Sequence, residues 1–222
     1  MQSREARLDS STFYRIVLIV IFSSLTVVRV SYRIVSGAVR DRIFSPREGM
    51  LPVVLRWILG LPLLYATGAY MFAPGSNPWM YVSVPIAGRA AGILMGCAAV
   101  LVIFLVHREL GACFSSTLVI RENHRLIRTG PYRFVRHPMY SAYLMLFIGA
   151  FLVSGNWVIG GCGVAVIATL MTVRLAREEA MLAEAFGAEH DDYRAATGMF
   201  IPMTHTIPRV VRAARSALRA RS

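Results

Sequence analysis

The chain has 222 residues, of which 56% are hydrophobic and 16% charged, and its mean hydropathy is +0.55. This composition excludes an ordinary soluble domain and indicates one integral membrane domain. The net charge of +12 comes from 24 basic residues, all of them arginine. Because no basic helix or aromatic RNA-binding stretch lies in a soluble segment, we expect anionic lipid headgroups, not nucleic acid, to meet this charge.

Five apolar stretches approach the roughly 20 residues that a helix needs to cross a bilayer. They are residues 13–35, 51–72, 82–106, 140–155 and 157–173. The last two are short and are separated only by Gly155 and Asn156, which predicts a tight helical hairpin. The sequence therefore predicts an all-α membrane protein with five transmembrane helices.

The arginines predict the orientation of this bundle. They are concentrated in the loop before Leu51, which carries Arg40, Arg42 and Arg47, in segment 107–139 and after residue 173, whereas loops 73–81 and 155–156 carry no charge. The positive-inside rule places the basic segments in the cytoplasm and the N-terminus outside. The first apolar stretch lacks a convincing cleavage site, so we expect it to remain as an anchor. A chain with no lysine and no eukaryotic targeting motif suggests a bacterial inner membrane.

Polar residues inside the apolar stretches need partners. Arg29, Arg56 and Arg89 lie in or near the first three stretches and are expected to snorkel or to find partners. Gly88, Gly92 and Gly96 repeat at intervals of four residues, and we interpret them as internal helix packing, with a dimer face as the alternative.

Beyond residue 173 the chain is rich in helix-forming residues. Residues 174–196 predict a cytoplasmic helix that Gly187 interrupts. Residues 209–222 predict a basic amphipathic helix on the inner leaflet, or a frayed tail. We expect one domain, residues 1–222, in which residues 1–110 supply membrane helices, 111–205 form a cofactor-binding core and 206–222 form the basic tail.

Segment 124–140 is polar, broken by two prolines and set between apolar stretches, so it is the predicted site. Pro138 disfavours an α conformation at His137 and suits the first turn of the next helix, whose unpaired N–H groups can bind oxygen atoms. Tyr132 and Tyr140 offer flat faces for a purine or a sulfonium. His137 can act as a general base or as a hydrogen-bonding holder of a ligand, and we favour the holder.

The second candidate element is Arg174 and Glu178, which are one helical turn apart on one face. An arginine there can hold an anionic group by a bidentate contact, and a glutamate can neutralise an ammonium group. The alternative is a surface ion pair. We expect His107, His190 and His205 to be incidental.

Three motifs carry a resemblance to a known family. They are Leu126-Ile127-x-Thr129-Gly130-Pro131-Tyr132-x-x-x-Arg136-His137-Pro138-x-Tyr140, then Arg174-x-x-x-Glu178-Glu179, then Phe186-Gly187 with Tyr193 and Pro202. Over roughly residues 115–205 the chain resembles the isoprenylcysteine carboxyl methyltransferase family and related membrane phospholipid methyltransferases. The resemblance implies a five-helix enzyme that uses S-adenosylmethionine on a lipophilic or prenylated acceptor, with S-adenosylhomocysteine as product.

The resemblance also implies roles for particular residues. Glu178 would bind the cofactor and act in catalysis, and Arg174 would hold the acceptor's carboxylate as a catalytic and substrate-binding residue. The remaining cofactor-binding residues would be His124, Arg125, Leu126, Ile127, Tyr132, His137, Pro138, Met139 and Tyr140.

Three other interpretations of the function remain open. One is N-methylation of a phospholipid or other amine, which would require His137 or Glu178 as a base because an amine must lose a proton. Another is a non-catalytic membrane protein. The last is a relative of sterol reductases that binds NADPH in the same pocket. No metal site is expected.

Overall fold

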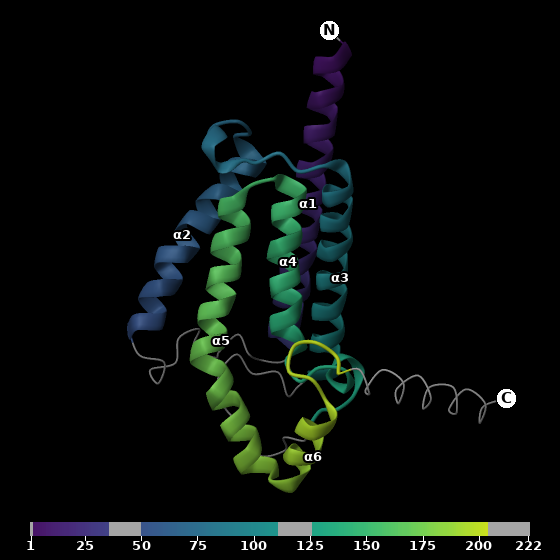
Figure 1. The fold of residues 1–222 in the computed structure, drawn as a ribbon, viewed down its shortest axis with the longest axis vertical. Coiled ribbons are helices and arrows are strands. Elements are labelled where there is room, and N and C mark those ends of the chain that lie inside the picture. The colour runs from purple at the N-terminus through teal and green to yellow at the C-terminus, as the bar shows by residue number, and fades with distance from the viewer. Residues whose placement is uncertain (1, 36–49, 111–125, 204–222) are drawn as a thin grey trace, which may run out of the picture.

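The computed structural model describes residues 2–35, 50–110 and 126–203, where all regular elements are helical (Figure 1). In chain order the elements are α1 (Gln2–Val35), α2 (Met50–Phe72), the short 3₁₀ helix η3 (Pro78–Met80), α3 (Ile86–Leu110), the 3₁₀ helix η5 (Gly130–Arg133), α4 (Pro138–Ser154), α5 (Trp157–Phe186) and α6 (Ala188–Ala196). The predicted all-α class is confirmed for this part of the chain. The predicted basic tail, residues 206–222, lies outside the described residues.

Four of these helices are long and apolar enough to cross a bilayer, which indicates a multi-pass membrane protein. The apolar spans are Ser11–Ile34, Val53–Phe72, Ile86–Leu110 and Trp157–Phe186. α4 is apolar but has only 17 residues. The structure thus confirms four of the five predicted spans by length and composition, and α4, which matches the predicted stretch 140–155, is shorter than a full span.

Two predicted boundaries are wrong. α3 begins at Ile86 and not at residue 82, because residues 81 and 82 are extended and pair with the hairpin turn, where Val82 N–H donates to the Gly155 carbonyl at 2.9 Å. The fifth helix is not short, since α5 continues past Val173 to Phe186. The residues after Val173 are good helix formers, and the helix ends only where Gly187 takes a positive φ of 49°.

The predicted helical hairpin is present, and its turn has well-formed caps. Gly155 has a φ of 70° and closes α4 through its N–H, which donates to the Phe151 carbonyl at 2.7 Å. Asn156 is fully buried, and its side-chain oxygen accepts hydrogen bonds from the N–H groups of Val158 and Ile159. Two residues thus reverse the chain and fix the start of α5.

α4 is the central helix: in Figure 1 it lies between α5 and α3, and α2 packs on the far side of α5. α3 and α4 approach closely because they meet at glycines. A Cβ added at Gly149 would lie 2.8 Å from the Gly92 carbonyl oxygen, and one added at Gly96 would lie 2.7 Å from Ile21 of α1. The interpretation of the glycine repeat as internal packing is confirmed for Gly92 and Gly96.

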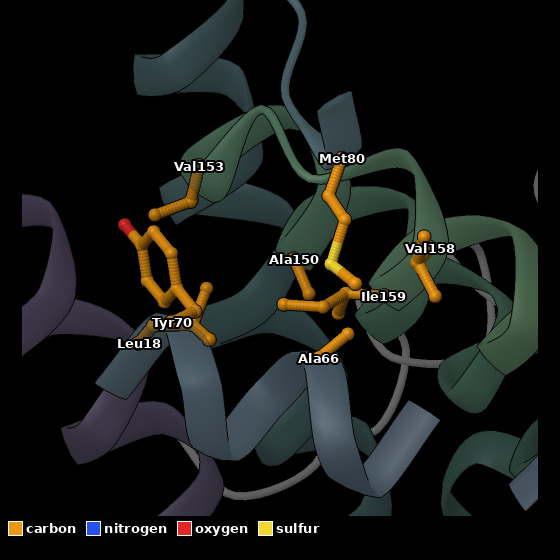
Figure 2. Close-up of a cluster of buried hydrophobic side chains, with 8 residues drawn as sticks. All are labelled: Leu18, Ala66, Tyr70, Met80, Ala150, Val153, Val158 and Ile159. Carbon is orange, nitrogen blue, oxygen red and sulfur yellow. The ribbon is translucent and has the colours of Figure 1, made fainter. Parts of the chain in front are cut away.

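The buried side chains form two clusters along this bundle. The first lies near the hairpin turn and joins α1, α2, α4 and α5 with Met80 (Figure 2); it consists of Leu18, Ala66, Tyr70, Met80, Ala150, Val153, Val158 and Ile159. The second lies further toward the start of α4 and consists of Ile21, Leu25, Ala99, Ile103, Ala142, Tyr143, Leu146 and Ile167. This packing fixes α4 against α5 and so fixes the relative positions of the site residues that these two helices carry.

Two of the arginines in apolar helices have the partners that their position requires. Arg29 of α1 donates to the Tyr143 hydroxyl of α4. Arg89 of α3 donates to the Val153 carbonyl at 2.6 Å and lies over the Tyr14 ring at 4.7 Å. Both contacts tie neighbouring helices together, so the expectation that these residues find partners is confirmed.

Candidate active site

The site lies at the end of the bundle opposite the hairpin turn, where the coil before α4, the last turns of α5 and the segment after α6 meet (Figure 1). Gly130 starts the coil's 3₁₀ turn with a φ of 57°. A Cβ there would lie 2.5 Å from the Glu109 side chain, and Glu109 accepts a hydrogen bond from the Thr129 hydroxyl at 2.5 Å. Gly130 therefore lets the coil press against the end of α3.

The residues just before α4 pair with the segment that follows α6. The N–H of Arg136 donates to the Gly198 carbonyl at 2.8 Å, and that of His137 donates to the Met199 carbonyl at 3.0 Å. The Arg136 guanidinium donates to the carbonyls of Arg194 at 2.9 Å and Thr197 at 2.6 Å. This pairing holds the coil in place from outside the bundle.

His137 is placed at the N-cap of α4, with a φ of −121° because Pro138 follows it. Its side chain makes no capping hydrogen bond and reaches α5 instead. Nε2 lies 2.6 Å from Glu179 Oε1, and Nδ1 lies 3.6 Å from Glu178 Oε2. The ring thus lies between two carboxylates, and since a carboxylate only accepts, Nε2 carries the hydrogen in its contact with Glu179.

Glu178 joins α5 to the first turn of α4. The Tyr140 hydroxyl donates to Glu178 Oε1 at 3.0 Å, while Oε2 faces His137. Arg174 is half-buried and lies one turn earlier on the same face of α5. The structure therefore brings Glu178 together with His137 and Tyr140, as the sequence predicted, and places Arg174 along the same helix face.

Tyr132 lies in η5, where a residue of α6 contacts its backbone. Its carbonyl accepts a hydrogen bond from the Tyr193 hydroxyl at 2.6 Å. Burial raises the pKa of the Tyr132 hydroxyl, and the nearby Tyr193 and Glu178 raise it further. Burial also raises the pKa of Tyr193, although Arg136 and Arg128 oppose this. Both tyrosines are neutral hydrogen-bonding groups at physiological pH.

The other predicted site residues are distributed around this centre. Leu126 and Ile127 are half-buried in the coil before η5. Pro138 is buried as the first residue of α4, and Met139 packs on the second core cluster. His124 and Arg125 lie outside the described residues.

The sequence interpretation missed three members of this cluster. Arg136 and Glu179 stand within the quoted motifs, yet no role was predicted for them, and they form an ion pair at 3.4 Å. His190, for which no role was predicted, is 1% exposed, and its Nε2 lies 3.9 Å from Glu179 Oε2. The sequence feature that could have indicated His190 is its spacing from Tyr193, since residues three apart lie on one face of a helix.

Residues 92–184 of the chain match the model of the isoprenylcysteine carboxyl methyltransferase family. This matched segment covers less than half of the chain. It includes α4, most of α5 and the motifs around His137 and Glu178, and it ends before α6. The resemblance on those motifs is thereby confirmed.

A curated relative supports the same family. The Protein-S-isoprenylcysteine O-methyltransferase of Schizosaccharomyces pombe is 30% identical over 97 residues, which are 43% of this chain and 41% of the relative. The alignment thus spans less than half the length of that relative. The family is one of methyltransferases, which suggests S-adenosylmethionine as methyl donor.

Proposed function

We propose that this protein is an S-adenosylmethionine-dependent methyltransferase that acts in the membrane on the carboxylate of a lipophilic acceptor. The observation that carries the proposal is the contact of Glu178 with both Tyr140, at 3.0 Å, and His137, whose Nδ1 lies 3.6 Å away. It joins the two family motifs into one polar cluster at the end of an apolar bundle, where a polar cofactor and a lipophilic acceptor can meet.

The residues present fit the proposed cofactor. α4 is a 17-residue helix whose N-cap side chain makes no capping hydrogen bond, so backbone N–H groups of its first turn are available for a carboxylate. Glu178 is the matching acceptor for an ammonium group. The proposed binding residues are Glu178 with His124, Arg125, Leu126, Ile127, Tyr132, His137, Pro138, Met139 and Tyr140. When bound, S-adenosylmethionine supplies a methyl group that is already activated on a sulfonium.

Arg174 is the proposed acceptor-binding residue. It lies one turn from Glu178 and on the same side of α5, within reach of a group beside the cofactor. A guanidinium positions a carboxylate by a bidentate contact, and a carboxylate needs no base at neutral pH. The protein's task is then to align the acceptor and to exclude water.

The contacts of His137 also favour a carboxylate over an amine. An amine acceptor must lose a proton, and His137 was one of two candidate bases. Its ring is held instead between Glu179 at 2.6 Å and Glu178 at 3.6 Å. This geometry suits a residue that orients Glu178 and the start of α4.

The cofactor is tested by calorimetry on the purified protein in nanodiscs. We expect binding of S-adenosylmethionine, a loss of about 100-fold in affinity for Glu178→Ala, and a smaller loss for His137→Ala. Glu184→Ala, an exposed glutamate further along α5, is the matched control and should bind normally. Unchanged affinity in both site variants, or retention of NADPH in place of S-adenosylmethionine, would overturn the proposal.

The acceptor class is tested with membranes and S-adenosylmethionine that carries a labelled methyl group. A methyl ester releases its label as volatile methanol in base, whereas an N-methyl group keeps it. We expect base-labile label in the lipid or protein fraction. Arg174→Ala should abolish labelling while the cofactor still binds, and the exposed Arg177→Ala is its control. Base-stable label would show N-methylation instead.

A further inference from the structure

His190 and Glu179 face each other with buried polar atoms that have no hydrogen-bond partner in the described part of the chain. Neither ring nitrogen of His190 is hydrogen-bonded among the described residues, and the same is true of Glu179 Oε2. His190 is 1% exposed, and its Nε2 lies 3.9 Å from that oxygen. A buried donor or acceptor without a partner costs about 1–3 kcal/mol, so such a facing pair calls for an explanation.

The two oxygens of Glu179 have different surroundings. Oε1 accepts hydrogen bonds from the His137 Nε2 at 2.6 Å and from the Arg136 Nε at 3.4 Å. Oε2 has only His190 within ion-pair distance among the residues described. The terminal torsion of a glutamate is soft, so a carboxylate held through one oxygen can rotate about that bond. A donor on Oε2 would stop this rotation and fix the group that holds His137.

The fold presents His190 to this oxygen by a specific route. Gly187 reverses the chain between α5 and α6 with a positive φ, and the His190 N–H donates to its carbonyl at 3.0 Å. Two contacts hold α6 against the coil before α4. Arg128 pairs with Glu189 at 3.1 Å, and Tyr193 donates to the Tyr132 carbonyl. The position of His190 is thus set by the same elements that enclose the site.

We propose that His190 is a positioning residue of the methyltransferase site, whose Nε2–H donates to Glu179 Oε2 and so locks the carboxylate that orients His137. The gap of 3.9 Å closes by a small rotation of the Glu179 carboxylate, and hydrogen bonds of catalytic sites often tighten only when their ligands bind. The inference rests on the proposed function, and it adds a residue outside the segment that matches the family model.

Three single variants test the donor. His190→Leu removes it and should weaken S-adenosylmethionine binding about tenfold, since contacting residues show strong coupling. His190→Gln keeps an amide N–H and should bind within about threefold of the unaltered protein. Asp192→Asn, at an exposed position of α6, is the matched control and should bind normally. A loss as large for Gln as for Leu, at equal thermal stability, would contradict a role through the donated hydrogen.

A double-mutant cycle identifies the partner. In a Glu179→Gln background, His190→Leu should cost less than about twofold, because the acceptor has already changed. If the tenfold loss persists there, His190 acts on something other than Glu179 and the proposal fails.

Nitrogen NMR on the protein with ¹⁵N-labelled histidine tests the contact without altering His190. The chain has five histidines, and His190→Gln identifies the resonance in question. We expect the His190 ring signals to shift in Glu179→Gln and to stay unchanged in Glu184→Gln. Identical spectra for Glu179→Gln would overturn the proposal even if His190→Leu does not fold. If the contact is present but S-adenosylmethionine does not bind, the proposed function fails, and the positioning role fails with it.

Discussion

The two ends of the α4–α5 hairpin both bury polar groups, and they do so in opposite ways. At the turn end, residues 154–157, the groups are neutral and paired: Asn156 caps α5, and the Ser154 hydroxyl donates to the Ala150 carbonyl at 2.6 Å. At the site end, residues 136–140 with 178 and 179, most groups are ionisable. There Glu179 and the neighbouring His190 keep polar atoms without a hydrogen bond among the described residues.

This difference separates polar groups that build the fold from those that act in a site. A buried polar group that is fully paired stabilises one structure and has no capacity left for a ligand. A cluster that keeps unpaired donors and acceptors is less stable than a fully paired one, and those donors and acceptors can bind a ligand or a side chain that moves. The turn end should therefore affect stability alone, and the site end should affect both stability and binding.

Arg136→Ala should have the largest effect. The Arg136 side chain is 7% exposed, and its guanidinium pairs with Glu179 and donates to the Arg194 and Thr197 carbonyls. Its loss leaves a buried carboxylate with one donor fewer, so we expect the free energy of unfolding to fall by about 3–5 kcal/mol. Thermal and denaturant unfolding in detergent measure this fall, and cofactor affinity should drop as well.

Arg133→Ala is the matched control for this variant. Arg133 is exposed and lies over the Phe134 ring at 4.8 Å, so its removal should change stability by less than about 0.5 kcal/mol. Equal effects of the two variants would mean that the ionic contacts of Arg136 contribute little. The contrast between the two ends would then be wrong.

Asn156→Ala tests the turn end and should have an intermediate effect. The variant loses both capping hydrogen bonds, at 3.0 and 3.2 Å, so stability should fall by about 1–2 kcal/mol. Asn77→Ala is the control, because Asn77 stands at the N-cap of η3 without a capping bond. Cofactor affinity should not change in either variant, and an affinity loss in Asn156→Ala would show that the two ends are coupled.

The same contrast explains what could be predicted from sequence. Hydropathy located four helices of spanning length, and Gly155 with Asn156 predicted the turn, because these are local signals. Hydropathy placed the end of the last transmembrane helix at Val173, whereas the helix predicted from helix propensity after that residue continues it without a break to Phe186. A charged residue ends an apolar stretch without ending a helix.

Contacts at the site end depend on packing, which a sequence does not display. Glu178 and Glu179 are adjacent, and only the packing of α5 on α4 decides which of them faces Tyr140 and which faces Arg136. His190 reaches the cluster through the reversal at Gly187, where a positive φ sets the direction of α6. The identities of the site residues could thus be predicted from motifs, whereas their partners could not.

Tyr193→Phe should have the smallest effect and depends on pH. The Tyr193 hydroxyl donates to the Tyr132 carbonyl at 2.6 Å, so its removal should cost about 1 kcal/mol near pH 7. Burial raises the pKa of Tyr193 in the folded protein. Above about pH 10 the unfolded chain loses this proton while the folded protein keeps it, so stability falls as pH rises. The variant should show a shallower fall there in denaturant unfolding between pH 7 and 11. Parallel curves would mean that the Tyr193 hydroxyl ionises as easily in the folded protein as in the unfolded chain, and α6 would then not be closed over the site.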